Sequence, residues 1–350
     1  MPSLDPLAEI RKILKNKRRP VCLMEVCGTH TMAIARAGIK RLLVPDIRLI
    51  SGPGCPVCVT PIEVIDYACR LAADNRNIVV SFGDMLRVPG SRGTLENYRP
   101  RVVYSPRDAL VIARENPDRN VIFIAVGFET TAPAIAATIL EARTLGLKNF
   151  YVLPALKTIP PALGYMLRRP RMRVDGFILP GHVSAIIGER PYQFIARRFG
   201  VPGCITGFEP AEIIRGIRNL IDQIAAGRAR ITNEYSWVVR PRGNPEARRL
   251  LSRVFKPAPS RWRGIGVIPA SGLNFKRTYQ VFDARRRFKI RVPRAAEPRG
   301  CLCAQVLLGL KEPADCARFG RECTPAAPIG ACMVSSEGAC AAVYRYGDNG

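Results

Sequence analysis

Ten of the twelve cysteines lie in groups whose spacing suits metal binding or thiol chemistry. Six lie beyond residue 300, and four form two pairs near the start of the chain, Cys22 with Cys27 and Cys55 with Cys58. Grouped thiols in a reducing compartment ligate metals or exchange electrons more often than they form structural disulfides. The cysteine pattern therefore predicts metal or thiol chemistry near both ends of the chain.

Two short motifs near the N-terminus combine cysteine with histidine or proline. Cys27 and His30 bound a Cys-Gly-Thr-His motif, and Cys55 and Cys58 bound a Cys-Pro-Val-Cys motif. A CxxC motif after a strand is used for reversible disulfide chemistry, because the attacking cysteine gains thiolate character near a helix start. Three thiolates and one imidazole also favour a soft or borderline ion such as Fe(II). Both roles are open, whereas Cys22 lies among aliphatic residues and is expected to pack in a core.

The two histidines and three acidic residues occupy similar loop positions. His30 and His182 are the only histidines of the chain, and each comes shortly after a strand-like run and a glycine. Both are candidate ligands or proton carriers. Glu129, Asp84 and Glu209 lie in comparable loops, where a carboxylate can act in chemistry or cap the first turn of a helix. The sequence leaves both roles open for these acids.

The cysteine-rich tail contains enough thiols for a metal centre. The first candidates for ligands, separated by 12, 6 and 16 residues, are Cys303, Cys316, Cys323 and Cys340. Cys301 and Cys332 compete with them. A [4Fe-4S] cluster needs four thiolates, and zinc also accepts four. The paired CxxC spacing typical of zinc is absent, so the tail favours an iron-sulfur cluster and keeps zinc as the alternative.

Short apolar runs predict the strands that position these motifs. They span residues 21–26, 47–51, 77–82, 120–126, 150–155 and 174–180. Continuous apolar strands followed by turns and helix-like stretches are typical of parallel sheets covered on both faces. Ligands of such sheets bind at the carboxyl ends of the strands. The loops after the runs are therefore expected to converge on a cleft.

The order of these patterns predicts an α/β fold with three domains. Two similar parallel-sheet α/β domains, residues 35–145 and 146–230, are expected to face each other across the cleft. A third domain, residues 1–34 and 231–350, would contain the cysteine-rich tail. This tail has too few large apolar residues to fold alone, so we expect an iron-sulfur cluster to organise it.

Charge and composition exclude several classes of function. Subtracting 28 acidic from 54 basic residues leaves a net charge of +26, which favours acidic partners but does not identify them. No aromatic-basic motif of a nucleic-acid-binding domain is present, and no apolar run is long enough to cross a bilayer. A Walker A motif and a Ser-His-Asp pattern are also missing. We expect a cytoplasmic protein that binds neither nucleic acid nor membrane.

Five longer motifs together resemble one known family. They are MEVCGTHT, SGPGCPVC, VGFETTAP, LPGHVSAIIG and CMVSSEGACAAVYRY, and they span nearly the whole chain. This set is similar to the HypD family, whose members are scaffolds in [NiFe]-hydrogenase maturation. The resemblance implies a three-domain α/β protein with a [4Fe-4S] cluster in its C-terminal domain and the Cys-Gly-Thr-His and Cys-Pro-Val-Cys loops in a cleft.

The resemblance also implies partners and residue roles. A HypD-like scaffold builds the Fe(CN)2CO group together with the chaperone HypC, using cyanide delivered by HypE. Its iron and chaperone site would correspond to Cys27, His30, Cys55 and Cys58, and its cluster to the four first candidates of the tail. From thiol chemistry we add a hypothesis: Cys27 holds Fe(II), while Cys55 and Cys58 alternate between dithiol and disulfide. Whether the chain is itself an enzyme stays open, and the alternative function is a cluster-containing thiol-disulfide oxidoreductase.

Overall fold

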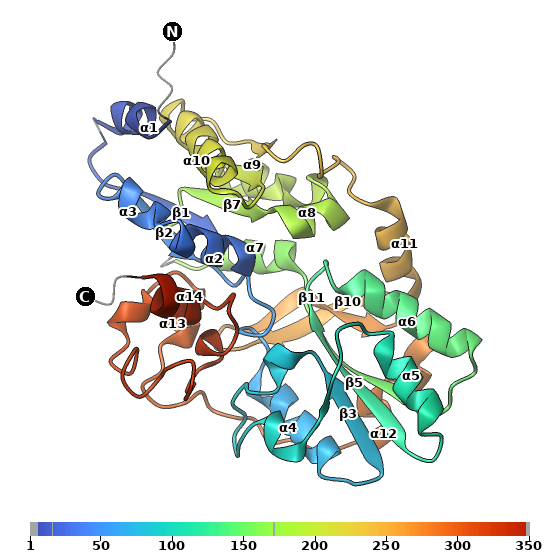
Figure 1. Cartoon of the computed structure of the whole chain (residues 1–350). Helices are drawn as coiled ribbons and strands as arrows, with labels where there is room; N and C mark the ends of the chain where they lie inside the picture. Colours follow the sequence, from blue (N-terminus) through green and yellow to red (C-terminus); the bar gives the residue numbers. More distant parts are fainter. Residues whose placement is uncertain (1–5, 16, 171, 348–350) are drawn as a thin grey trace.

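Two parallel sheets form the framework of the chain. The structure is a computed structural model that describes residues 6–15, 17–170 and 172–347 (Figure 1). One sheet, which we call sheet A, has the strand order β2-β1-β7-β8-β9, and the other, sheet B, has the order β4-β3-β5-β6. All neighbouring strands within both sheets are parallel. The predicted α/β class with parallel sheets is therefore confirmed.

Sheet A combines the beginning of the chain with its middle. Its strands are β1 (Val21–Glu25), β2 (Ile47–Ser51), β7 (Gly176–Pro180), β8 (Gly203–Thr206) and β9 (Ile231–Asn233). Both faces are apolar because residues of one strand alternate between two clusters: Leu23 packs with Ile217 on one face, and Met24 packs with Phe177 on the other. Covering the first face are α1 (Pro6–Leu14), α3 (Ile39–Leu43) and α10 (Pro210–Ala225). Helices α7 (Ile159–Leu167), α8 (Gly181–Ile187) and α9 (Gln193–Phe199) contribute to the second cluster.

Sheet B is built from one continuous part of the chain. Its strands are β3 (Asn77–Ser81), β4 (Arg101–Val102), β5 (Asn120–Gly127) and β6 (Phe150–Leu156). One face packs against α5 (Asp108–Glu115) and α6 (Ala132–Thr144), through Val121, Phe123 and Ala125 of β5. The other face packs against α4 (Ile62–Ala72) and belongs to the same apolar cluster as the second face of sheet A. A shared core thus joins the two sheets.

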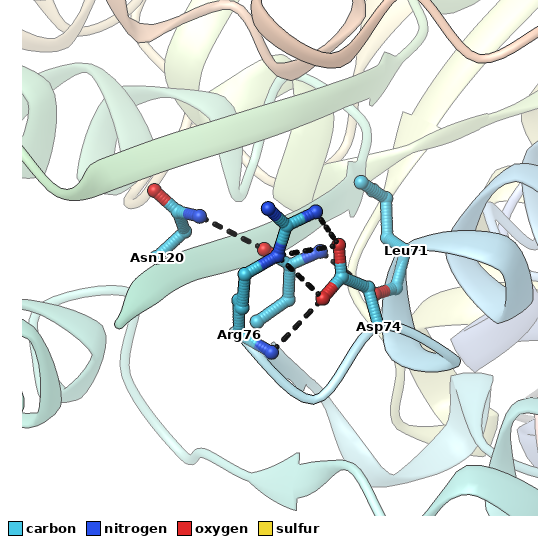
Figure 2. Close-up of polar contacts among 5 residues, drawn as sticks. Leu71, Asp74, Arg76 and Asn120 are labelled. Carbon is cyan, nitrogen blue, oxygen red and sulfur yellow. Dashed lines mark hydrogen bonds and ion pairs between the residues drawn. The ribbon is translucent and has the colours of Figure 1, made fainter. Parts of the chain in front are cut away.

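Polar contacts fix the amino ends of β3 and β5. In the turn before β3, the Arg76 guanidinium donates to the Asp74 carboxylate at 2.7 and 3.0 Å (Figure 2). The buried Asn77 amide donates to the Leu71 carbonyl at 2.9 Å and accepts from the Asn120 amide at 3.0 Å. These bonds hold α4, β3 and β5 in register, so the loops at the opposite ends of the strands start from fixed positions.

An antiparallel hairpin lies between the sheets (Figure 1). It consists of β10 (Phe255–Trp262) and β11 (Gly266–Phe275), and Lys157 beyond β6 forms a bridge with Gly272 of the hairpin. Before it comes α11 (Pro245–Val254), and after it comes α12 (Ala284–Phe288). Because this bridge joins the hairpin to the residue that follows β6, the hairpin lies next to the carboxyl edge of sheet B.

The cysteine-rich tail packs against the N-terminal half of sheet A. Its helices are α13 (Cys303–Leu307) and α14 (Ala339–Tyr346), and α14 lies beside α2 (Gly28–Arg36) (Figure 1). Between them run loops with short 3-10 turns at Pro313–Asp315 and Ala331–Met333. The last part of the chain therefore closes over one of the first helices.

Sheet membership does not follow the predicted domain ranges. Strand β6 pairs with β5, although residues 146–230 were expected to form a separate domain. Strands β1 and β2 pair with each other, although residue 34 was expected to separate two domains. The physical reason is that the chain leaves sheet A after β2, builds sheet B and then returns. The three-domain division itself stays a prediction, and its residues 1–5 and 348–350 lie outside the described ranges. Within the described ranges, no helix has the length and apolarity needed to span a bilayer.

Candidate functional site

The loops after β1 and β2 meet through their backbones. Cys27 is the N-cap of α2, and the N–H of Gly28 donates to the Gly54 carbonyl at 3.0 Å. A side chain at Gly54 would collide with the backbone of Cys27, so only glycine permits this approach. The structure therefore brings the Cys-Gly-Thr-His loop and the Cys-Pro-Val-Cys loop together at the carboxyl edge of sheet A.

Glu25 holds the Cys27 loop through hydrogen bonds. Its buried carboxylate accepts from the Cys27 N–H at 3.1 Å and from the Thr31 hydroxyl at 2.5 Å. Burial raises the pKa of Glu25 to about 7, and these hydrogen bonds oppose the increase. Glu25 is not among the residues that the sequence motifs indicate. A single acidic residue inside the apolar run VCLMEV was the available signal, because buried carboxylates need specific partners.

Burial also shifts the pKa of the Cys27 thiol. It raises the pKa of Cys27 to about 12, while the backbone N–H groups of His30 and Thr29 act in the opposite direction. A buried thiol remains protonated unless a cation replaces its proton. The N–H groups at the helix start would favour the resulting thiolate.

His30 is completely buried and held in one tautomer. Its Nε2 lies 2.8 Å from the Gly207 carbonyl and 2.9 Å from the Thr206 hydroxyl. Because a carbonyl only accepts, Nε2 carries the proton and Nδ1 keeps a free lone pair. Nδ1 has no hydrogen-bond partner within the described part of the chain. Burial lowers the pKa of His30 to about 4, so the ring is neutral at physiological pH.

Cys55 and Cys58 are in direct contact. The backbone N–H of Cys58 donates to the Cys55 sulfur at 3.2 Å, and both side chains are buried, with 3% and 0% exposure. The Cys58 thiol points at the Ala331 carbonyl at 3.8 Å and also contacts the Cys332 thiol. Burial raises the pKa of Cys58 well above its ordinary value. The motif therefore lies between Cys27 and the cysteine-rich tail.

The tail brings further thiols together beyond Cys332. Contacts run from Cys332 to Cys303 and Cys340, and from Cys303 to Cys301. The Cys332 N–H donates to the Cys303 sulfur at 3.2 Å. Cys323 is on the edge of this group, with its sulfur accepting from the Ile329 N–H at 3.4 Å. We call these five residues, together with Cys316, the tail thiols.

Cys316 lies beside the start of the tail thiols. Its thiol donates to the carbonyl of Gly300, the residue before Cys301, at 3.6 Å. Among the described residues, no three His, Cys, Asp or Glu side chains are arranged to hold one ion. Each thiolate of a [4Fe-4S] cluster binds a different iron, so cluster ligands need not converge on one point. The donor chemistry of the tail thiols fits such a cluster, and the choice of four among six stays a prediction.

A polar chain through the tail links the loops of both sheets. Thr29, in α2 after strand β1 of sheet A, donates to the Glu337 carboxylate at 2.8 Å, and Ser335 donates to Asp84, which follows strand β3 of sheet B, at 2.9 Å. Gly28 packs against Glu337 so closely that a side chain there would collide with it. Ser335 and Glu337 belong to the motif CMVSSEGACAAVYRY, whose pattern alone predicts no role for either residue. The structure gives them one, because they fix the tail over the Cys27 loop.

The remaining candidates differ in burial and in their contacts. Glu129 is buried, its carboxylate accepts from the Ile159 N–H at 3.0 Å, and burial raises its pKa to about 7. His182 is exposed and stacks on Phe208 at 3.9 Å, and the ring of His30 contacts the same Phe208 at 4.6 Å. Glu209 caps α10 in a capping box, which selects the structural role left open for it. Cys22 is buried, as expected.

Comparison with known proteins gives matches over nearly the whole chain. A family model named HypD, described as "Hydrogenase formation hypA family", matches residues 5–347. The hydrogenase maturation factor HypD of Rhodobacter capsulatus is 44% identical over 355 residues, covering 97% of this chain and 94% of that protein. The corresponding factor of Cupriavidus necator is 44% identical over 337 residues, with 93% and 89% covered. That of Escherichia coli K12 is 42% identical over 334 residues, with 94% and 90% covered.

Proposed function

Because the chain belongs to the HypD family of hydrogenase maturation factors, we propose that it is the scaffold on which the Fe(CN)2CO group of a [NiFe]-hydrogenase is assembled. It would work in the cytoplasm with a HypC-type chaperone and receive cyanide from a HypE-type donor. None of the twelve cysteines forms a disulfide, which is in keeping with a reducing compartment. The iron is the substrate of this scaffold.

The proposal rests mainly on the tautomer and the hydrogen bonds of His30 at the start of α2. Its Nε2–H is fixed by the Gly207 carbonyl, and its Nδ1 lone pair is buried without a partner among the described residues. Metal-binding histidines typically donate their second ring N–H to a carbonyl or carboxylate, which orients the free lone pair. We therefore assign Cys27 and His30, which share the first turn of α2, as the residues that hold the iron.

Glu25 positions the loop that presents Cys27. Its carboxylate is bonded to the Cys27 N–H and to Thr31, so the sulfur is held at the helix start before iron arrives. Binding of Fe(II) would release the thiol proton, because the thiolate is the ligand form. Glu129 and His182 are proposed to carry protons at the border of the site. Glu129 supports this role with a buried carboxylate oxygen that has no partner among the described residues.

Cys55 and Cys58 are proposed to supply reducing equivalents. Oxidation of the two thiols to a disulfide releases two electrons and two protons. The Cys58 N–H bonded to the Cys55 sulfur keeps the two residues in contact, as the disulfide requires. For the neighbouring cluster we propose the ligands Cys303, Cys316, Cys323 and Cys340, and a bound [4Fe-4S] cluster supplies one-electron transfer. The contact between Cys58 and Cys332 supports communication between the two thiol groups.

The test of the iron site uses cells that lack their own HypD. Cys27→Ala and His30→Ala should abolish hydrogenase activity, and the purified variants should lack the infrared bands of iron-bound cyanide and CO. Cys69→Ala is the matched control, because this half-buried cysteine of α4 lies outside the site and should leave both readouts unchanged. Normal bands in Cys27→Ala protein would rule out the proposed iron site.

The ligand set of the cluster needs a separate measurement. Anaerobically purified Cys316→Ala protein should lose iron and acid-labile sulfide, whereas Cys301→Ala protein should retain both. The two residues neighbour each other through Gly300, so the comparison controls for local disruption. The reverse result would exchange Cys316 for Cys301 in the ligand set. Zinc without sulfide would replace the cluster by a structural zinc site.

The alternative function is a thiol-disulfide oxidoreductase. It rests on the same contact between Cys55 and Cys58, but neither sulfur is accessible to a substrate in this conformation. Dithiol-dependent reduction of a small disulfide by the chain alone would favour this alternative. Turnover that requires the chaperone and cyanide donor would favour the scaffold.

A further inference from the structure

A cavity lies away from the proposed iron site. Its volume is about 410 Å³, and it is enclosed by the end of β6, the hairpin β10–β11, the start of α4 and the segment 290–294. This volume falls within the range of small-molecule sites. The walls include the apolar side chains of Val64 and Ile290 and the ring of Tyr67. None of the residues assigned to iron or cluster binding lines it.

Four cationic side chains surround this cavity, which we call the cationic cavity: Lys157, Arg261, Arg285 and Arg294. Glu63 is the only acidic residue among its lining residues, and its carboxylate accepts from the Ala295 N–H at 3.4 Å. With four cationic side chains and one acidic side chain, the lining has an excess of positive charge.

Lys157 is the buried member of this group, with 2% exposure. Its ammonium donates to the Ser260 hydroxyl at 3.2 Å and to the Arg261 carbonyl at 2.9 Å, which leaves one of its three N–H groups without an acceptor among the described residues. Burial and the nearby Arg285 lower the pKa of Lys157 to about 7. A buried ammonium beside a second cation is costly without a counter-ion.

The three arginines also lack ion-pair partners within the described part of the chain. Asp283 attracts Arg285 electrostatically, but its carboxylate accepts from the backbone N–H of Arg285 at 2.9 Å and forms no salt bridge with the guanidinium. Arg261 and Arg294 form no salt bridge with any described carboxylate. Guanidinium groups bind phosphate and carboxylate oxygens through paired hydrogen bonds. The free donors of this cavity thus match the acceptors of an oxyanion.

We propose that the cationic cavity binds a small molecule with several negative charges carried by phosphoryl or carboxylate oxygens. The ammonium of Lys157 contacts the buried end of the anion, and the guanidinium groups of Arg261, Arg285 and Arg294 neutralise the rest. The apolar walls formed by Val64, Tyr67 and Ile290 accommodate an uncharged part of the molecule. Occupancy connects α4 to the hairpin and to residues 290–294.

Equilibrium dialysis of the full chain with radiolabelled pyrophosphate, and in parallel with citrate, tests the proposal. Saturable binding of one anion per chain is expected. Arg285→Gln and Lys157→Met should each weaken binding on the order of tenfold, as for the loss of one charge-assisted hydrogen bond. Arg286→Gln is the matched control, because Arg286 belongs to the same helix but donates to Gln280 instead of lining the cavity.

Each binding result either identifies the class of anion that the cavity binds or overturns the proposal. Binding of pyrophosphate alone identifies a phosphoryl ligand, binding of citrate alone identifies a polycarboxylate, and binding of both supports the shared oxyanion chemistry. Absence of saturable binding overturns the proposal. So does equal weakening by Arg286→Gln and Arg285→Gln, since that result would reflect general attraction to a chain with a net charge of +26. Arg285 is exposed, so its substitution keeps the test valid even where Lys157→Met fails to fold.

Discussion

Replacing Lys157 by methionine should change how stability depends on pH. The folded pKa of Lys157 is about 7, and its ordinary value is 10.5. Between these values the unfolded chain binds a proton at this lysine and the folded chain does not. Stability therefore rises with pH across this window, because the unfolded state carries more protons there. Methionine has no proton to bind and preserves most of the side-chain volume.

The size of this effect follows from the two pKa values. The wild-type free energy of unfolding should increase by about 2 kcal/mol relative to Lys157→Met between pH 7 and pH 9, from the linkage relation. The comparison cancels the ionisation of the cysteines, which titrate in the same way in both proteins. At pH 7, Lys157→Met should be the more stable protein where the lost hydrogen bonds cost less than burying the charge.

Urea unfolding monitored by tryptophan fluorescence is the appropriate assay. Trp262 is completely buried in the hairpin and lies 5.7 Å from the Lys157 ammonium, whereas Trp237 is exposed. The change in fluorescence on unfolding therefore reports mainly on the surroundings of Lys157. A wild-type to variant difference that stays constant from pH 7 to pH 9 would refute a depressed pKa at this lysine.

Three further substitutions test the contacts that position the site. Gly54→Ala should displace the Cys27 backbone and lower the melting temperature and iron binding, whereas Gly83→Ala, whose added Cβ would make only an ordinary van der Waals contact with Val102, should change neither. Asn77→Ala should destabilise the chain by about 2 kcal/mol in urea unfolding, because one buried and one partly buried hydrogen bond are lost; a change near zero would contradict this role. Thr29→Val should loosen the tail and speed its proteolysis in limited digestion, and Thr144→Val, an exposed control on α6, should not.

The apolar runs of the sequence predicted the first strands well. Residues 47–51 coincide with β2, and residues 77–82 and 150–155 differ from β3 and β6 by one residue. Strand β10 was not predicted because Pro257 and Pro259 interrupt it. Both are tolerated in a two-stranded hairpin, which is irregular between Ala258 and Ser260.

Sheet assignment depends on information that local patterns do not contain. The run that forms β3 is as apolar as the run that forms β2, yet β3 starts a new sheet. Which strands become neighbours is decided by packing between distant segments, such as β1 against β7. The predicted domain ranges followed sequence order and therefore divided both sheets.

The site could be predicted where reactive residues form motifs. Cys27, Cys55 and Cys58 were selected from their spacing, and the structure brings their loops together. Cys332 was treated as a competitor in the tail, and its contact with Cys58 was not foreseen, because it joins segments separated by most of the chain. Glu337 was missed for the same reason, since its role depends on the contact with Thr29.

The order of the strands along the chain has a consequence for biosynthesis. During translation, β1 and β2 emerge early but lack their neighbour β7 until sheet B has been completed. The tail, which covers Cys27 through Glu337 and Cys58 through Ala331 and Cys332, is made after both sheets. A nascent chain that has not yet been synthesised as far as the tail therefore cannot enclose Cys27 and Cys58.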